Sequence, residues 1–132
     1  MMVFITEADY VDKAEAVIKG LANKVGRNGR PEPMVTTSKI RNLLAMSADI
    51  YNEVMTLQED RLPEEIAGRI TYLRMRFVYE AGREPKTVKP FVEEAKILDI
   101  LKSVGASKKD FVLFNRYMEA LVAFHRFYGG KD

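Results

Sequence analysis

The sequence predicts an all-α fold, a compact bundle of about five helices in a single domain that spans residues 1–132. Apolar residues recur at steps of three and four along five stretches, as they do on the buried face of a helix. No stretch sustains the alternation of apolar and polar residues that is typical of a strand. Glycine or proline separates the stretches, so most connections are short, and helices joined in this way pack as a bundle.

The composition indicates a folded protein that does not enter a membrane. A chain of 132 residues can bury a core, and a hydrophobic content of 47% excludes a disordered chain. The absence of cysteine excludes disulfides and thiolate metal sites, and is compatible with a reducing cytoplasm. No apolar run approaches the roughly 20 residues that a membrane span needs, and no signal peptide is visible. We therefore expect a cytoplasmic protein without a membrane partner.

Positive charge is concentrated in the second half of the chain. The formal net charge is +2. Residues 1–66 hold 8 Lys or Arg and 11 Asp or Glu, whereas residues 67–132 hold 13 Lys or Arg and 8 Asp or Glu. A basic half of this kind points weakly to a polyanionic partner.

The first helix is predicted over residues 7–25, and Gly26 ends it. Residues 26–35 then contain two glycines, two prolines and two arginines, which predicts a flexible basic loop longer than most connections. Arg27 and Arg30 either lie on a mobile surface or form a basic arm that becomes ordered on a partner. The apolar face of the helix consists of Tyr10, Ala14, Val17, Ile18 and Leu21.

The second helix begins near Thr37, its expected N-cap, and its buried side extends to Val54. Lys39 and Arg41 fall in the first turn, where cations oppose the helix dipole. A helix N-terminus that carries added cations is, however, a ready phosphate site. The pair is therefore interpreted either as solvated charge or as a phosphate-binding pair.

The third helix is predicted from Pro63, in its first turn, to Gly82, taken as the glycine that follows the helix. A stripe of apolar residues along it is expected to be buried, and consists of Ile66, Ile70, Leu73 and Phe77.

A second stripe on this helix alternates arginine and tyrosine, and consists of Arg69, Tyr72, Arg76, Tyr79 and Arg83. At about 100° per residue it lies roughly 130° from the apolar stripe. Arginine forms bidentate pairs with phosphate, and tyrosine offers a ring and a hydroxyl, so the stripe suits a nucleic-acid backbone. The alternative is an ordinary solvated face, because the helix begins acidic and becomes basic, as its dipole favours.

A basic connector over residues 83–89 leads to a fourth helix, predicted from about residue 88 to 104 and ended by Gly105. Ser107 and Asp110 resemble a capping box for a fifth helix, from about Lys108 to Tyr128. The fifth helix is apolar over a wide arc, which indicates core packing or, in part, a subunit interface.

No set of residues indicates catalysis, a metal or a cofactor. The motifs GxxxxGK[ST], GxGxxG and GxSxG are absent. His125 is the only histidine and takes a core-facing position, where a structural role is expected. Neither Glu93–Glu94 nor Glu119 combines with the histidine at a helical ligand spacing, and the adjacent pairs Glu64–Glu65 and Glu93–Glu94 point in divergent directions. We predict a protein without enzymatic activity.

Three blocks of the sequence resemble the small subunit of the type III-A CRISPR effector, the Csm complex. They are TTSKIRNLL (36–44), RITYLRMRFVYEAGRE with VKPFVEEAKIL (69–84 and 88–98), and RYMEALVAFHRFYGGKD (116–132). The resemblance covers most of the chain, the blocks come in the family's order, and the last block is the most specific. The resemblance implies a non-catalytic helical subunit that stacks in several copies along a filament of backbone subunits, beside a large subunit.

The resemblance also implies contact with guide RNA and target RNA. The positions that match the family's basic residues are Lys39, Arg41, Arg69, Arg74, Arg83 and Arg116. Arg76 joins them from the arginine–tyrosine stripe rather than from the family. In this interpretation guide pairing supplies the sequence information, and the subunit grips the RNA backbone.

Two other interpretations fit the same sequence. The equivalent small subunit of a type III-B (Cmr) complex is also a small helical bundle, although the FYGGKD end favours type III-A. A helical protein–protein adaptor without RNA contact belongs to another class, and its basic face would be solvated. Salt-dependent RNA binding distinguishes the adaptor, because an adaptor has no reason to show it.

Overall fold

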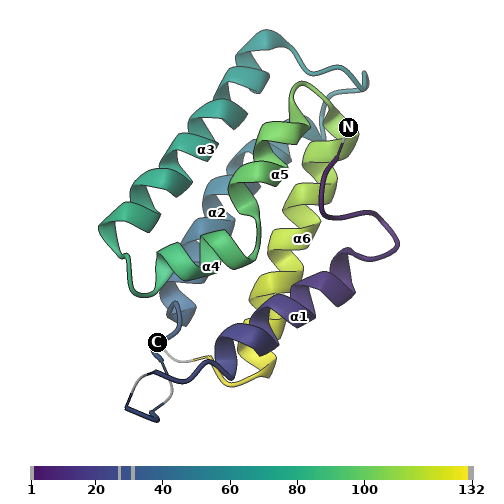
Figure 1. The fold of residues 1–132 in the computed structure, drawn as a ribbon. Coiled ribbons are helices and arrows are strands. Elements are labelled where there is room, and N and C mark those ends of the chain that lie inside the picture. Colours follow the sequence, from purple (N-terminus) through teal and green to yellow (C-terminus); the bar gives the residue numbers. More distant parts are fainter. Residues whose placement is uncertain (1, 27, 31, 131–132) are drawn as a thin grey trace.

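The computed structural model describes residues 2–26, 28–30 and 32–130, and six α-helices follow one another along this part of the chain (Figure 1). The predicted all-α class is confirmed, since the described residues form no strand, and their β pairing is confined to isolated bridges such as that between Arg61 and Ser107. The helices are α1 (Tyr10–Ala22), α2 (Thr37–Val54), α3 (Glu64–Arg83), α4 (Val88–Glu94), α5 (Ile97–Val104) and α6 (Lys108–Phe127).

The last helix, α6, is the one against which both N-terminal helices pack. It contacts α1, α2 and α5, and Figure 1 shows α1 lying across its C-terminal half. The Ser107 hydroxyl accepts a hydrogen bond from the Asp110 N–H (3.1 Å), so the predicted cap at its start is present. The buried side chains of α6 are Phe111, Leu113, Phe114, Asn115, Tyr117, Met118, Leu121 and His125.

The core lies between α6 and the remaining helices. Phe77 of α3 meets Phe114 of α6 edge to face, with ring centroids 6.4 Å apart and planes at 86°. Polar groups inside this core need partners, because a buried group without one is costly. The Ser47 hydroxyl donates to Asn115 Oδ1 (2.8 Å), which joins α2 to α6.

The predicted fourth helix is divided into α4 and α5. The break falls at Lys96, which adopts a left-handed conformation (φ 58°, ψ 31°). The apolar spacing explains the break. On one continuous helix, Ile97 and Val104 would point roughly 180° away from Val88 and Ala95, at about 100° per residue. All four are fully or almost fully buried, so the chain must turn between Ala95 and Ile97 to bring both stripes to the core.

Three predicted helices have boundaries that differ from the structure. The first helix spans Tyr10–Ala22 rather than residues 7–25. The N-cap of α2 is Thr36, whose hydroxyl accepts from the Lys39 N–H (3.1 Å), rather than Thr37, which is buried. Gly82 does not follow α3 but lies inside it, because the helix continues to Arg83. Glycine at position 82 is therefore not required by a left-handed C-terminal turn.

The connection from α1 to α2 contains the predicted flexible basic loop. Arg27 lies outside the described residues, and Arg30 is exposed. The Gly26 N–H donates to the Arg30 carbonyl (2.8 Å), and the Glu32 N–H donates to the Lys24 carbonyl (3.0 Å). The mobility of residues 26–35 and their ordering on a partner stay predictions.

His125 joins the C-terminal end of α6 to the residues before α2. Its ring is fully buried, and Nε2 donates a hydrogen bond to the Val35 carbonyl (2.6 Å). Gly130 closes over the ring and donates its N–H to the His125 carbonyl (2.8 Å). A Cβ on Gly130 would lie only 2.0–2.7 Å from the ring atoms, so this position has no room for a side chain. The histidine occupies the structural position that the sequence predicts.

Apolar side chains also remain on the outside of the bundle. No described helix is long and apolar enough to span a lipid bilayer. The exposed large hydrophobic side chains are nevertheless unevenly placed, because one helix, α3, carries a group of them. This group consists of Tyr72, Met75, Val78 and Tyr79.

Substitution of two glycines by alanine should have opposite effects on stability. Gly130→Ala should lower the free energy of unfolding by about 1–3 kcal/mol, because its Cβ would overpack the His125 ring. Gly68→Ala, inside α3 with open space around the position that its methyl group would take, should raise it by about 0.5–1 kcal/mol through helix propensity. Chemical denaturation measures both values. Equal effects of the two substitutions would contradict the contact described for Gly130.

Candidate nucleic-acid interface

Three of the predicted arginines lie along one side of α3, next to α2. Arg69, Arg76 and Arg83 are seven residues apart, so they repeat about every 10.5 Å and return to nearly the same side of the helix. We call them the arginine flank. Their side chains are 41%, 40% and 61% exposed, so each guanidinium can reach a ligand from solvent.

Two exposed tyrosines of α3 lie beside the arginine flank. Tyr72 and Tyr79 are more than half exposed. The Arg76 guanidinium carbon lies 5.5 Å from the centre of the Tyr79 ring, a cation–π contact. A surface groove of about 560 Å³ lies between α2 and α3, and its lining residues include Ile50 and Leu73. The predicted alternation of charge and aromatic surface is thus present on an accessible face.

Arg74 does not belong to the arginine flank. It is half-buried and lies two residues before Arg76, which places it roughly 160° away around the helix. The structure therefore separates Arg74 from the other three arginines of α3.

Arg69 pairs with Glu53, near the C-terminal end of α2. The two side chains are 41% and 50% exposed, so water competes with the ion pair. Such pairs typically contribute about 0–1 kcal/mol. The contact joins the end of α2 to the start of α3 without withdrawing the Arg69 guanidinium from solvent.

The other end of the arginine flank is built on a buried carboxylate. Glu80 is 5% exposed, and three cations surround it. Its Oε1 lies 3.0 Å from Lys39 Nζ and 3.8 Å from Arg83 Nη1, and its Oε2 lies 3.3 Å from Arg76 Nη2. A buried charge requires this compensation, because removing it from water is costly. We call these four residues and Glu84 the Glu80 cluster.

Lys39 lies inside this cluster rather than on an open surface. Its side chain is 21% exposed, and its ammonium is 3.0 Å from Glu80 and 2.9 Å from Glu84. Hydrogen bonds to Glu84 and then Glu80 raise the pKa of Lys39 above its usual value. The bond from Lys39 is the main cause that lowers the pKa of Glu80, with Arg83 and Arg76 adding to it. The unexpected cation in the first turn of α2 thus neutralises the end of α3.

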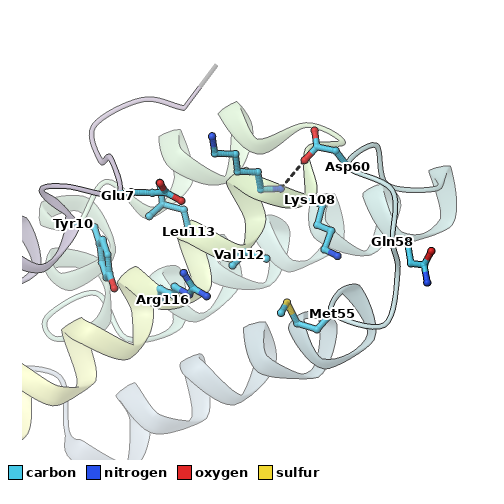
Figure 2. A pocket seen from close by; sticks show the side chains of 10 residues that line it. Glu7, Tyr10, Met55, Gln58, Asp60, Lys108, Val112, Leu113 and Arg116 are labelled. Carbon is cyan, nitrogen blue, oxygen red and sulfur yellow. Dashed lines mark hydrogen bonds between the residues drawn. The ribbon is translucent and has the colours of Figure 1, made fainter.

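The remaining predicted residues lie elsewhere. Arg41 is exposed on the first turns of α2 and lines a shallow pocket with Thr37 and Asn42. Arg116 is exposed on α6 and lines a different hollow of about 530 Å³ (Figure 2). Tyr10 and Met55 belong to the same hollow. The seven predicted residues are therefore distributed over three helices, and only part of them forms one continuous flank.

The sequence analysis missed Glu80, although the sequence contains a signal for it. The apolar stripe Ile66, Ile70, Leu73 and Phe77 proceeds in steps of four, three and four, and the next step of three reaches Glu80. An acidic residue at a buried position needs a cation from a neighbouring element. Lys39, the residue whose charge opposed the α2 dipole, is that cation.

Comparison with known proteins identifies the family. The family model described as Csm2 Type III-A matches residues 12–131. The chain belongs to the Csm2 family of type III-A CRISPR systems. It is 40% identical over 131 residues to the CRISPR system Cms protein Csm2 of Streptococcus thermophilus, covering 99% of this chain and all of that protein. The protein of the same name from Mycobacterium tuberculosis (strain CDC 1551) is 40% identical over 128 residues, covering 97% of this chain and 98% of that protein.

A third member of the Csm2 family, from Enterococcus italicus, is 38% identical over 101 residues, covering 74% of this chain and 71% of that protein. These matches confirm the predicted resemblance to the type III-A small subunit. They favour it over the type III-B alternative, because the matching family model is the type III-A one.

The Glu80 cluster predicts a dependence of stability on acid. The pKa of Glu80 is lowered from 4.5 in the folded chain, so its contribution is present above about pH 4.5 and is lost as the pH falls through the lowered value. Glu80→Gln should reduce the free energy of unfolding at pH 7 by about 1.5–3 kcal/mol, through lost charge-assisted bonds. Denaturant unfolding of both proteins at pH 7 and pH 3 measures the effect.

The difference between the two proteins should shrink at pH 3, because Glu80 is then protonated to a larger extent in the wild type as well. Glu94→Gln, at an exposed position, is a matched control that should change stability by about 0.5 kcal/mol or less. A difference between wild type and Glu80→Gln that is equal at both pH values would contradict the ionised cluster.

Proposed function

We propose that this member of the Csm2 family is a non-catalytic RNA-binding subunit that grips the backbone of guide RNA and target RNA through α3. The observation that carries the proposal is the arginine flank: three partly exposed guanidiniums at seven-residue intervals, with exposed tyrosines beside them. Guanidinium groups match phosphate oxygens in geometry and charge. The face therefore suits an extended polyanion better than a compact ligand.

Recognition through phosphates requires no sequence preference in the subunit. Base pairing between guide and target supplies the sequence information, and the subunit responds to backbone position and shape. Tyr72 and Tyr79 add aromatic surface and hydroxyls that reach riboses or unpaired bases. Arg41, Arg74 and Arg116 lie outside the arginine flank, and we propose them as additional contacts to RNA in the assembly.

Partners supply the affinity that one copy lacks. A single flank with three arginines makes few phosphate contacts, so RNA binding by one copy should be weak. Further copies along a filament, held by the backbone and large subunits of the Csm complex, make later contacts effectively intramolecular. Such a complex would act in the cytoplasm, as the cysteine-free composition suggested.

A second candidate function is that of a protein–protein adaptor. The exposed Tyr72, Met75 and Val78 favour it, because an apolar group on one helix is also typical of a protein interface. The two functions differ in salt dependence, since phosphate contacts release counterions and apolar contacts do not.

Substitution in the arginine flank should change RNA binding and leave folding intact. Arg69→Ala and Arg83→Ala should each weaken binding to labelled single-stranded RNA of any sequence, and flatten the log–log salt dependence by about 0.7. Arg69→Ala should change stability by about 0.5 kcal/mol or less, and Arg83→Ala by about 1 kcal/mol or less because it also removes one cation from Glu80. Fluorescence anisotropy at two salt concentrations, together with thermal unfolding, measures both quantities.

Two controls define the result. Lys102→Ala removes an exposed charge from α5, away from the flank, and should leave the salt slope unchanged. Phe77→Ala should cost about 3–5 kcal/mol of stability through a core cavity, because Phe77 is fully buried. If the arginine variants lose stability instead of RNA affinity, the flank is structural and the proposed function is wrong.

The subunit should show no nuclease activity with or without a divalent metal. Within the described residues, no three His, Asp or Glu side chains gather into a group that could hold a metal ion. The measurement is incubation of labelled RNA with the purified protein, with Mg²⁺, with Mn²⁺ and with a chelator. Metal-dependent cleavage that disappears on His125→Ala, in a protein that still folds, would refute a non-catalytic role.

A further inference from the structure

Glu80 places a negative charge among the cations of a face that is proposed to bind RNA phosphates. The Glu80 cluster contains Lys39, Arg76 and Arg83 but also two carboxylates, so its formal net charge is only +1. A surface selected only to attract phosphate gains nothing from these acids. Glu80 is moreover buried on the apolar side of α3, where an uncharged residue would pack at lower cost.

The geometry shows what the carboxylate does to its neighbours. Glu80 lies four residues after Arg76 and three before Arg83, so all three side chains meet on one side of α3. Each arginine directs one terminal nitrogen towards Glu80, 3.3 Å and 3.8 Å from its oxygens. A guanidinium has five N–H donors, so the others stay available to a ligand. Arg76 donates a hydrogen bond to the carboxylate, whereas Arg83 is attracted to it as an ion pair at the longer distance, so Glu80 draws both guanidiniums towards one point.

Lys39 holds the carboxylate in place from the neighbouring helix. Its ammonium bonds to Glu80 and also to Glu84, and little of its side chain is exposed. With two carboxylates as partners, Lys39 is largely occupied within the protein. The side chains of Arg76 and Arg83 are 40% and 61% exposed, so these two are the exposed cations of the cluster.

We propose that Glu80 is a positioning residue, which holds Arg76 and Arg83 as an oriented pair for two RNA phosphates, with Lys39 as its anchor. This inference rests on the proposed RNA-binding function of the arginine flank. Side chains ordered before binding lose less conformational freedom when the RNA arrives, so order compensates for the charge that Glu80 removes. Lys39 contributes to RNA binding through Glu80 and not through a phosphate of its own.

The test compares the direction in which RNA affinity changes when a carboxylate is removed from this face. Glu80→Gln makes the surface one charge more positive, and so does the matched control Glu65→Gln, at an exposed position of α3 that lines the groove beside Arg69 and Arg76 but lies outside the Glu80 cluster. If acids on this face only repel RNA, both variants bind RNA more tightly. If Glu80 positions the arginines, Glu80→Gln binds roughly fivefold more weakly, as expected when charge-assisted contacts are loosened, while Glu65→Gln binds at least as tightly as wild type.

The measurement is anisotropy with the full chain, using a labelled oligouridine strand and a labelled RNA duplex, between about 50 mM and about 200 mM salt. Thermal unfolding confirms that each variant is folded at the assay temperature. Glu80→Asp provides a second test, because it keeps the net charge and withdraws the carboxylate by one methylene. It should also weaken binding, and it decides the question if Glu80→Gln does not fold.

The remaining outcomes separate this inference from the function on which it rests. If Arg76→Ala and Arg83→Ala weaken binding but folded Glu80→Gln or Glu80→Asp binds as tightly as wild type, the positioning role is wrong and the RNA-binding function stands. If Arg76→Ala and Arg83→Ala both leave binding unchanged, this end of the flank does not contact RNA, and the positioning role is overturned with it.

Discussion

The ion pair between Lys39 and Glu80 is the constraint on which the α2–α3 face depends. Glu80 is buried at the C-terminal end of α3 and Lys39 lies in the first turn of α2, so the pair fixes how the two antiparallel helices meet. Arg69 and Glu53 make the corresponding contact at the opposite ends of the same helices. The Lys39–Glu80 pair is largely shielded from water, whereas the Arg69–Glu53 pair is exposed. Salt and acid should therefore affect the two ends of the α2–α3 contact differently.

If the proposed function is right, this arrangement answers two opposing demands on one surface, attraction of the RNA and order of the side chains that bind it. Exposed arginines attract a polyanion but are flexible, and their ordering on binding opposes association. Carboxylates reduce the attraction, yet they restrict the side chains that they contact. In this chain the carboxylate is buried and the guanidiniums are outside, so the ligand meets the cations first. In the proposed function a phosphate therefore reaches the guanidiniums before Glu80, although the cluster carries a formal net charge of only +1.

Helical periodicity was sufficient to predict the all-α class, the buried stripe of α3 and the start of α6, because each is a local pattern. The division between α4 and α5 was missed because no glycine or proline marks Lys96, and only the phase of the apolar stripe changes there. Lys39 was recognised as anomalous, but its partner lies 41 residues away, and pairing at that distance depends on tertiary packing. Sequence therefore identified candidate cations more readily than their relative arrangement.

The hydrogen bond from His125 to the Val35 carbonyl joins residues 90 positions apart, and Tyr128 bonds to Glu15 over 113 positions. Both α1 and α2 bury their apolar faces against α6, which is synthesised last. During translation α2 can pack on α3 and α1 on α4, but the contacts of both helices with α6 cannot form until α6 has left the ribosome. The two N-terminal helices therefore complete their packing only after the C-terminal helix has been made.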